Sequence, residues 1–229
     1  MTKEQLEIEL KKYNLNCIDE LESLMDDTLL TNEKFNLTAI KDKEKFRELM
    51  ILDSLLPLSF INLDNKKVLD IGTGAGYPGL PLAIASKGEF TLLDSTKKKI
   101  DYIIDYVSTH NIKNVTAVSS RAEDYVKDHR EEFDVVIARA VSSLNVLLEL
   151  ALPFVKVGGV FIAMKGKQGE EEISQSKRAL ALLGGEIASI NKSILPESGE
   201  ERINIVITKN KETNKKYPRM YKDIINKPL

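Results

Sequence analysis

Apolar positions recur at helical spacing through the first 62 residues of the chain. The apolar residues that keep this spacing are Ile8, Leu10, Tyr13, Leu15, Ile18, Leu21, Leu24, Met25, Leu29 and Leu30. Glycine, which weakens helices, does not occur before Gly72. The stretch 35–40 interrupts the pattern, which then resumes over 42–50. The spacing predicts an N-terminal helical segment, residues 1–62, that packs its apolar side on the rest of the protein.

Beyond Lys66, short apolar runs alternate with helical stretches. The apolar runs are 68–71, 90–94, 115–118, 133–138 and 160–164. The helical stretches are 78–86, 97–110, 144–150 and 170–183. This alternation is typical of a doubly wound α/β sheet whose strands are covered on both faces. Two last runs, 186–190 and 203–208, are joined by a loop alone, so the sheet is predicted to end in an antiparallel strand pair.

A glycine-rich loop follows the first predicted strand. Residues 74–79 read Gly-Ala-Gly-Tyr-Pro-Gly, which matches the G-x-G-x-x-G pattern of nucleotide-binding loops. Glycines let the backbone turn tightly and approach a ligand, and the helix that follows presents free N–H groups and partial positive charge. We therefore expect Gly72 and Gly74 to lie against a bound ligand. The pattern alone does not distinguish one nucleotide ligand from another.

Two acids narrow the choice of ligand. Asp70 precedes the loop, where a carboxylate would repel a pyrophosphate but attract a cation such as an α-ammonium group. Asp94 ends the next strand, at about the offset where an acid receives ribose hydroxyls. S-adenosylmethionine explains both acids and NAD explains one, and a purely structural loop is the remaining alternative. The sequence thus predicts a Rossmann-like class I methyltransferase domain, residues 63–208, with S-adenosylmethionine as cofactor.

Further candidate residues follow the third and fourth strands. The backbone N–H of Ala122 or Glu123 can hold an adenine base, because ligands of such sheets lie beyond the carboxyl ends of the strands. Ser120 with Glu123 also forms the pattern of a helix capping box, and both interpretations can be true together. Arg139 ends the fourth strand and is the candidate for positioning the acceptor or the methionine carboxylate. The alternative for Arg139 is a structural salt bridge.

The acceptor atom is constrained by motifs that the chain lacks. The polar-Pro-Pro-aromatic motif of amino-methyltransferases is absent after the fourth strand. Methylation of pyrimidine C5 requires a cysteine nucleophile, and the single cysteine, Cys17, lies far in sequence from that strand. Guanine N7 already carries an in-plane lone pair, so its methylation needs alignment but no general base. A ribose 2′-hydroxyl is the rival acceptor, with Lys165 to lower its pKa. We favour Lys165 as an anion or RNA-phosphate contact at the rim.

Charge is distributed unevenly along the 229 residues. The formal net charge is −2, but residues 209–229 hold seven Lys or Arg and two acids, a net +5, so the remainder is −7. Such a tail indicates either an anionic partner or a solvated terminus. No apolar run reaches the length of a membrane helix, and no secretory leader is visible. One cysteine and two histidines argue against a disulfide or a metal site, so we expect a cytoplasmic protein without metal.

Several motifs together resemble one family. They are Asn36-Leu37-Thr38, Leu52-Asp53-Ser54-Leu55, residues 70–81, Leu92-Leu93-Asp94-Ser95, Ser120-Arg121, Phe133-Asp134, Ala138-Arg139-Ala140, Lys165-Gly166 and Lys216-Tyr217-Pro218-Arg219. The set resembles the bacterial 16S ribosomal RNA guanine-N7 methyltransferases, also called glucose-inhibited division protein B. The resemblance implies methylation of N7 of one guanine in the helix 18 loop of 16S rRNA. The cofactor contacts that it implies are Gly72, Tyr77, Ala122, Glu123 and Arg139.

The resemblance also implies a partner, which is 16S rRNA or the 30S subunit, bound by a monomer. The residues expected to contact RNA are Lys165, Lys215, Lys216, Tyr217 and Arg219, with Tyr217 and Tyr221 stacking on unpaired bases. Met50 stands where many family members have histidine, although Asp53 and Ser54 match. Two rival hypotheses are a methyltransferase of a small molecule or protein, and an RNA-binding assembly factor without catalysis.

Overall fold

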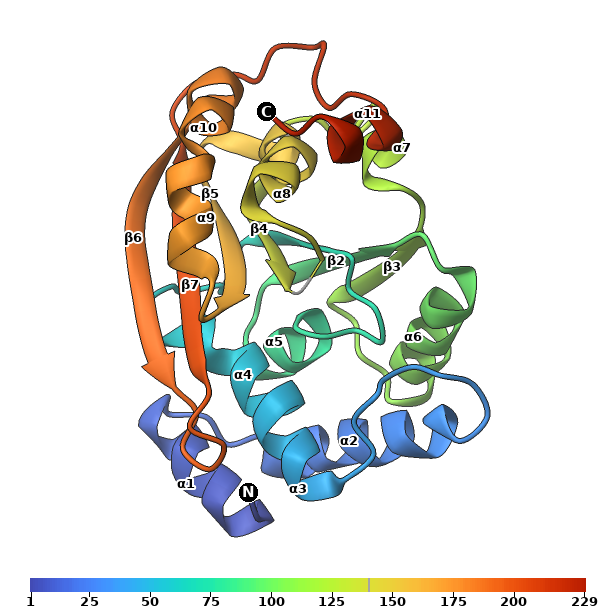
Figure 1. Cartoon of the computed structure of the whole chain (residues 1–229). Coiled ribbons are helices and arrows are strands. Elements are labelled where there is room, and N and C mark those ends of the chain that lie inside the picture. The colour runs from blue at the N-terminus through green and yellow to red at the C-terminus, as the bar shows by residue number, and fades with distance from the viewer. Residues whose placement is uncertain (140) are drawn as a thin grey trace.

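The computed structural model describes residues 1–139 and 141–229, so Ala140 of the Ala138-Arg139-Ala140 motif lies outside the description. The described chain builds a seven-stranded sheet in the order β3-β2-β1-β4-β5-β7-β6, with helices on both faces (Figure 1). The strands are β1 (Lys67–Ile71), β2 (Glu89–Asp94), β3 (Val115–Ser119), β4 (Phe133–Arg139), β5 (Val155–Gly166), β6 (Gly185–Ile194) and β7 (Glu201–Lys209).

Strand direction divides the sheet into two parts. Strands β3, β2, β1, β4 and β5 are parallel, while β7 runs antiparallel between β5 and β6. This confirms the predicted doubly wound sheet with its closing antiparallel pair. The five parallel strands end at one edge, which we call the carboxyl edge, and start at the opposite amino edge. Because ligands of such sheets bind beyond the carboxyl ends, the carboxyl edge is where the site should lie.

Alternate residues of the strands serve two separate cores. In β1, Val68 packs with one apolar cluster and Leu69 with the other, and Val135 and Val136 of β4 divide in the same way. This follows from the period of two in a strand, which turns successive side chains to opposite faces. The helices of the domain are α5 (Gly79–Ala85), α6 (Lys97–Thr109), α7 (Ala122–Tyr125), α8 (Leu144–Ala151), α9 (Gly169–Gln175) and α10 (Lys177–Leu183).

The N-terminal segment is helical and shares the first of these cores. It comprises α1 (Lys3–Lys12), α2 (Ile18–Asn32), α3 (Lys43–Phe46), the π-helix η1 (Arg47–Leu52), α4 (Asp53–Leu55) and the 3-10 helix η2 (Leu56–Ser59). Leu6, Leu21 and Leu24 are fully buried in the cluster that also contains Val68 and Leu80. The segment is therefore part of the same apolar core as the sheet. In the described part of the chain, no helix is long and apolar enough to span a membrane.

Several predicted elements differ in extent from the observed ones; for example, the strand predicted over 186–190 spans Gly185–Ile194. The single helix predicted over 170–183 is broken at Ser176, whose hydroxyl donates to the Glu172 carbonyl at 2.7 Å. Serine competes with the backbone for such bonds, which favours a helix end. The strand predicted over 160–164 extends in fact over Val155–Gly166, because β4 pairs with it at Val155 and β7 pairs with it as far as Gly166 opposite Arg202.

The C-terminal segment is folded onto the domain. Lys209 is the last residue of β7, and its buried ammonium donates to the Leu152 carbonyl at 2.7 Å and to Glu131 at 3.1 Å. Because β7 is antiparallel to β5, Lys209 lies at the amino edge of the sheet. The chain then continues to α11 (Tyr221–Asn226), which packs its buried Ile224 against α8. Lys209 is thus a core residue and does not belong to a solvated tail.

Candidate active site

The glycine-rich loop joins β1 to α5 at the carboxyl edge. The N–H groups of Gly72 and Thr73 donate to the Leu93 carbonyl of β2, at 2.8 and 3.1 Å. Gly72 and Gly74 have φ of +70° and +59°, a conformation that L side chains rarely adopt. Among the described residues, a Cβ at Gly74 would come within 4 Å only of the Lys99 ammonium. The loop therefore leaves space above Gly74 into which a ligand fits.

Asp70 lies beneath this loop. The side chain is fully buried, and Oδ2 accepts hydrogen bonds from the Thr73 hydroxyl at 2.6 Å and the Gly79 N–H at 2.9 Å. Burial raises the pKa of this carboxyl to about 6, against the lowering effect of these two bonds. Asp70 lines neither of the two cavities described next. Its position does not support the direct contact with the cofactor ammonium predicted from the sequence; the carboxylate shapes the loop.

A small cavity of about 340 Å³ opens at the ends of β2 and β3. Its lining includes Ile71, Gly72, Leu93, Asp94, Ser95, Ser120, Arg121, Ala122, Glu123, Arg139, Val141, Leu150 and Tyr221. Asp94 accepts hydrogen bonds from the Gly74 N–H at 3.0 Å and the Thr96 N–H at 2.8 Å. The structure thus brings Gly72, Asp94, Ala122 and Glu123 together around one space, as a common ligand would require.

The turn after β3 differs from the predicted capping box. Helix α7 begins at Ala122 with Arg121 as its N-cap, and no side chain caps it. The Ser120 hydroxyl instead donates to the Arg121 carbonyl at 3.2 Å. The chain enters the helix one residue later than the pattern implies, so the Ser120 side chain does not reach the third helical N–H. The N–H groups of Ala122 and Glu123, at the start of the helix, have no acceptor within it.

A large cavity of about 700 Å³ adjoins the small one. The two share Gly72, Arg139 and Val141. The rest of the large lining includes Leu37, Ile40, Leu49, Met50, Asp53, Thr73, Gly74, Ala75, Tyr77, Ser142, Met164, Lys165, Gly166, Glu172, Glu200 and Arg202. It is bounded by the glycine loop on one side and by the N-terminal helices and the start of β7 on the other. The N-terminal segment therefore forms a wall of the site.

Tyr77 fastens the glycine loop to the N-terminal helices. Its hydroxyl lies 2.9 Å from the Thr28 hydroxyl of α2, which is also 2.7 Å from the Tyr102 hydroxyl of α6. The Thr28 hydroxyl has one hydrogen and donates it to the Leu24 carbonyl, so both tyrosines donate to Thr28. The ring meets Phe46 edge to face at 5.5 Å. Tyr77 thus has a packing role and lines the large cavity, while its cofactor contact stays a prediction.

Arg139 lies at the boundary between the two cavities. Its Nη1 donates to the Leu49 carbonyl at 3.2 Å and to Oδ2 of Asp53 at 3.3 Å. Its Nη2 donates to the Met50 sulfur at 3.5 Å, a weak acceptor, so this nitrogen keeps most of its hydrogen-bonding capacity. The structural salt bridge considered for Arg139 therefore exists, and the side chain still lines both cavities. Met50 contacts this arginine directly.

Asp53 receives a second arginine. Nε of Arg202, at the start of β7, lies 3.1 Å from Oδ2 of Asp53, and Nη1 of Arg202 lies 2.8 Å from Glu200. Glu48 of η1 accepts from the N–H groups of Glu197 and Ser198 in the turn before β7, at 2.6 and 3.0 Å. The turn between β6 and β7 is therefore fastened to the N-terminal helices, which fixes the position of Arg202 in the site.

Lys165 differs from its predicted position at the rim. It is only 9 % exposed, and its ammonium pairs with Glu172 of α9 at 2.8 Å and donates to the Ser142 carbonyl. The lysine does line the large cavity. The ammonium has three N–H groups and these partners take two of them, so most of its charge is paired inside the protein.

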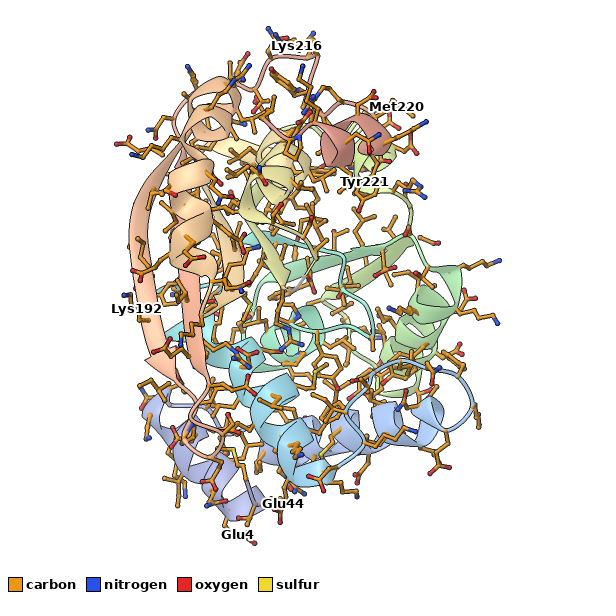
Figure 2. The ribbon with its side chains drawn as sticks, in the orientation of Figure 1. Glu4, Glu44, Lys192, Lys216, Met220 and Tyr221 are labelled. Carbon is orange, nitrogen blue, oxygen red and sulfur yellow. The ribbon has the colours of Figure 1, made fainter. Side chains whose placement is uncertain are left out.

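The four C-terminal residues predicted to contact RNA divide into two buried or paired side chains and two exposed ones. Tyr217 is buried, and its ring would have to leave the core to stack on a base. Arg219 forms a bidentate pair with Glu149 of α8, whose side chain is fully buried, at 2.8 and 2.6 Å. The structure therefore counts against RNA contacts by these two side chains. Lys215 and Lys216 are exposed, and Figure 2 shows Lys216 at the opposite end of the molecule from Glu44 of α3.

Comparison with known families decides the assignment. The family model described as rRNA small subunit methyltransferase G matches residues 17–202. The chain belongs to this family. This confirms the resemblance and the methyltransferase class predicted from the sequence.

Relatives of the family match along nearly the whole chain. The Ribosomal RNA small subunit methyltransferase G of Fusobacterium nucleatum is 40 % identical over 228 residues, which cover 99 % of this chain and 98 % of the relative. The protein of the same name from Caldicellulosiruptor bescii is 44 % identical over 212 residues, covering 90 % and 89 %. The matched length includes the N-terminal wall of the site as well as the sheet.

Solved structures support the fold. M. jannaschii TYW2, solved in complex with AdoMet, superposes with a TM-score of 0.57 at 18 % identity, over 69 % of this chain and 76 % of that chain. A SAM-dependent methyltransferase from Aquifex aeolicus gives a TM-score of 0.55 at 19 % identity, over 72 % and 93 %. At this level of identity the likeness concerns the fold, which is the class I arrangement predicted from the alternating pattern.

Two residues of the large cavity were missed by the reasoning from sequence. Asp53 belongs to a segment that resembles the family, but no role followed from that match. Arg202 lies in the last strand, 149 positions further along, and carried no motif at all. Their meeting depends on the antiparallel return of β7 beside β5, which brings Arg202 to the carboxyl edge opposite Gly166. Only the topology joins these two residues.

Proposed function

We propose that this chain transfers the methyl group of S-adenosylmethionine to N7 of a guanine in small-subunit ribosomal RNA, in the helix 18 loop of 16S rRNA. The observation that carries the proposal is the pair of adjoining cavities that share Gly72 and Arg139. The small cavity has an acid, Asp94, at the end of β2 and suits a nucleoside. The large cavity has room for a base. A methyl donor across their boundary would face an acceptor in the large cavity.

The residues of the small cavity fit the adenosine part of the cofactor. Asp94 is placed to accept ribose hydroxyls, and the N–H groups of Ala122 and Glu123 are available to the edge of adenine. The open backbone at Gly74 accommodates the ligand at the loop. Arg139, whose Nη2 has only a thioether as partner, is suited to the methionine carboxylate. S-adenosylmethionine supplies a sulfonium-activated methyl group in this place.

The charged groups of the large cavity suit an acceptor that needs no base. Its ionisable side chains pair among themselves, as Arg139 with Asp53, Lys165 with Glu172 and Arg202 with Glu200. Guanine N7 attacks through a lone pair that it already has, so catalysis rests on alignment and exclusion of water. A ribose 2′-hydroxyl would need Lys165 to lower its pKa, and the Lys165 ammonium is already bonded to Glu172 and to the Ser142 carbonyl.

Methyl transfer followed by mapping tests the proposal. The protein is incubated with tritiated S-adenosylmethionine and either free 16S rRNA or 30S subunits that lack the modification, and the labelled nucleotide is then located. We expect label at N7 of one guanine. Label on a ribose would favour the rival acceptor, and label on a small molecule or protein would favour another methyltransferase activity. RNA binding without any label would favour an assembly factor.

A further inference from the structure

Asp53 lines the acceptor cavity, and one of its two carboxylate oxygens is buried beneath the cavity surface. The residue is only 5 % exposed, and Oδ2 takes both arginine contacts, from Arg139 at 3.3 Å and Arg202 at 3.1 Å. Within the described part of the chain, Oδ1 is buried and has no hydrogen-bond partner. An unpaired buried carboxylate oxygen is costly, because it has lost water and gained nothing in return. Such a group, in a cavity wall, indicates a donor that arrives with the ligand.

We propose that Asp53 recognises the acceptor base as guanine by accepting hydrogen bonds from its Watson–Crick edge, an inference that rests on the proposed function. That edge of guanine carries two adjacent donors, N1–H and the N2 amino group. Oδ1 of Asp53 is free to accept one of them, and Oδ2 accepts the other when one of its two arginine contacts gives way. Unpaired bases of RNA are commonly read on this edge. The N7 atom lies on the opposite side of the ring and stays free to meet the methyl group.

The arginines beside Asp53 complete the match. Guanine O6 is an acceptor that adjoins N1–H. Among the described residues the Nη2 of Arg139 has only the weak Met50 sulfur as a partner, so one of its two N–H groups can serve the methionine carboxylate and the other O6. Adenine would place an N1 lone pair against the carboxylate and an amino group against the arginine, so each contact would be repulsive. A buried polar site of this kind rejects the wrong ligand strongly because its own groups are then left unpaired. The arrangement therefore selects guanine over adenine.

The chain holds Asp53 rigidly for such a role. Asp53 follows η1, a π-helical turn, and π-turns within helices are frequent at functional sites. The next residue, Ser54, donates its hydroxyl back to the Met50 carbonyl, within η1. From the other side, Glu48 fastens the turn that leads to Arg202. The partners of Asp53 are thus fixed before the base enters, which a specific contact requires.

The test changes the base and the enzyme together. The acceptor guanine is replaced by inosine, which keeps N7, O6 and N1–H but lacks the N2 amino group, in 30S particles reconstituted with otherwise identical 16S rRNA. For the unmodified enzyme we expect kcat/KM to fall roughly tenfold to a hundredfold with inosine, the discrimination usual for a bidentate base contact. For Asp53→Asn we expect lower activity on guanine and a guanine-to-inosine ratio close to one.

A matched control variant distinguishes recognition of the base by Asp53 from a purely structural role of this corner of the site. Glu48→Gln disturbs the same corner of the site without touching the base, so we expect it to lower activity on both substrates and to keep the ratio of the unmodified enzyme. An unchanged ratio in Asp53→Asn would show that Asp53 is structural and would overturn the inference.

The unmodified enzyme alone also decides the matter if Asp53→Asn fails to fold. Equal rates on inosine and guanine would show that nothing reads the N2 amino group, and this would overturn the inference too. Absence of methyl transfer to N7 of guanine by the unmodified enzyme would instead overturn the proposed function, so the two failures are distinguishable.

Discussion

At the scale of single residues, Asp70 shows how one side chain supports the site without lining it. Its carboxylate holds the Thr73 hydroxyl and the Gly79 N–H, the two ends of the turn that forms the glycine loop. Complete burial raises its pKa to about 6, well above the 3.8 of a free side chain. The sequence alone predicts a ligand contact for Asp70, because an acid before a glycine loop gives the same pattern whether it binds the ligand or supports the loop.

The raised pKa of Asp70 predicts a pH-dependent stability. Between pH 4 and 6 the folded state retains a proton that the unfolded state has lost, so the free energy of unfolding falls as pH rises through this window. Above about pH 6 the loss is complete and amounts to about 3 kcal/mol. Urea unfolding of the protein and of Asp70→Asn from pH 4 to 7 checks this. We expect the stability difference between them to change across the window, and parallel curves would contradict the prediction.

At the scale of elements, the alternation of apolar runs and helical stretches predicted the order and type of the sheet elements. Their lengths were less accessible, because strand ends depend on the partner strand. Strand β5 extends to Gly166 only because β7 pairs with it there. The break between α9 and α10 depends on one side-chain bond from Ser176 to a backbone carbonyl. The local spacing of apolar residues shows neither which strand pairs at a strand end nor which side chain bonds to the backbone at a helix end.

The π-helix η1 acts through Glu48, which gives the element its own prediction. Glu48 is 3 % exposed and accepts from two N–H groups in the turn between β6 and β7. Glu48→Ala leaves these donors unsatisfied, so we expect a loss of about 1–3 kcal/mol in the free energy of unfolding. Urea denaturation measures this loss. Glu48→Gln keeps one acceptor oxygen and should cost less; equal losses in the two variants would show that packing, not hydrogen bonding, is responsible.

At the scale of the whole molecule, the site combines segments that are far apart in the sequence. The small cavity follows one local pattern, strand, glycine loop and acid, so the sequence alone could place Gly72 and Asp94 around one space. The acceptor half is made by a helix before the sheet and a strand at its end. Neither Asp53 nor Arg202 stands near a motif with a known chemistry. Sequence reasoning therefore predicted the reaction class better than the acceptor side.

Charge at the two edges of the sheet leads to a last prediction. Lys215 and Lys216 follow β7 at the amino edge, away from the cavities, whereas Lys97 and Lys98 lie at the carboxyl edge in the first turn of α6. Lysine in a first turn opposes the helix dipole, a local cost that an anionic partner would offset. Both pairs are exposed. Lys97 and Lys98 therefore lie at the same edge of the sheet as the large cavity.

We expect charge reversal at Lys97 and Lys98 to weaken binding of 16S rRNA more than the same reversal at Lys215 and Lys216, which serves as the charge-matched control. Each lost phosphate contact to single-stranded RNA lowers the slope of log affinity against log salt by about 0.7, so the slope should fall by about 1 to 2. Binding titrations between 50 and 200 mM salt measure it, and cofactor affinity should stay unchanged in both variants. A larger effect at Lys215 and Lys216 would place the RNA on the amino edge, as the charge of the C-terminal residues first indicated.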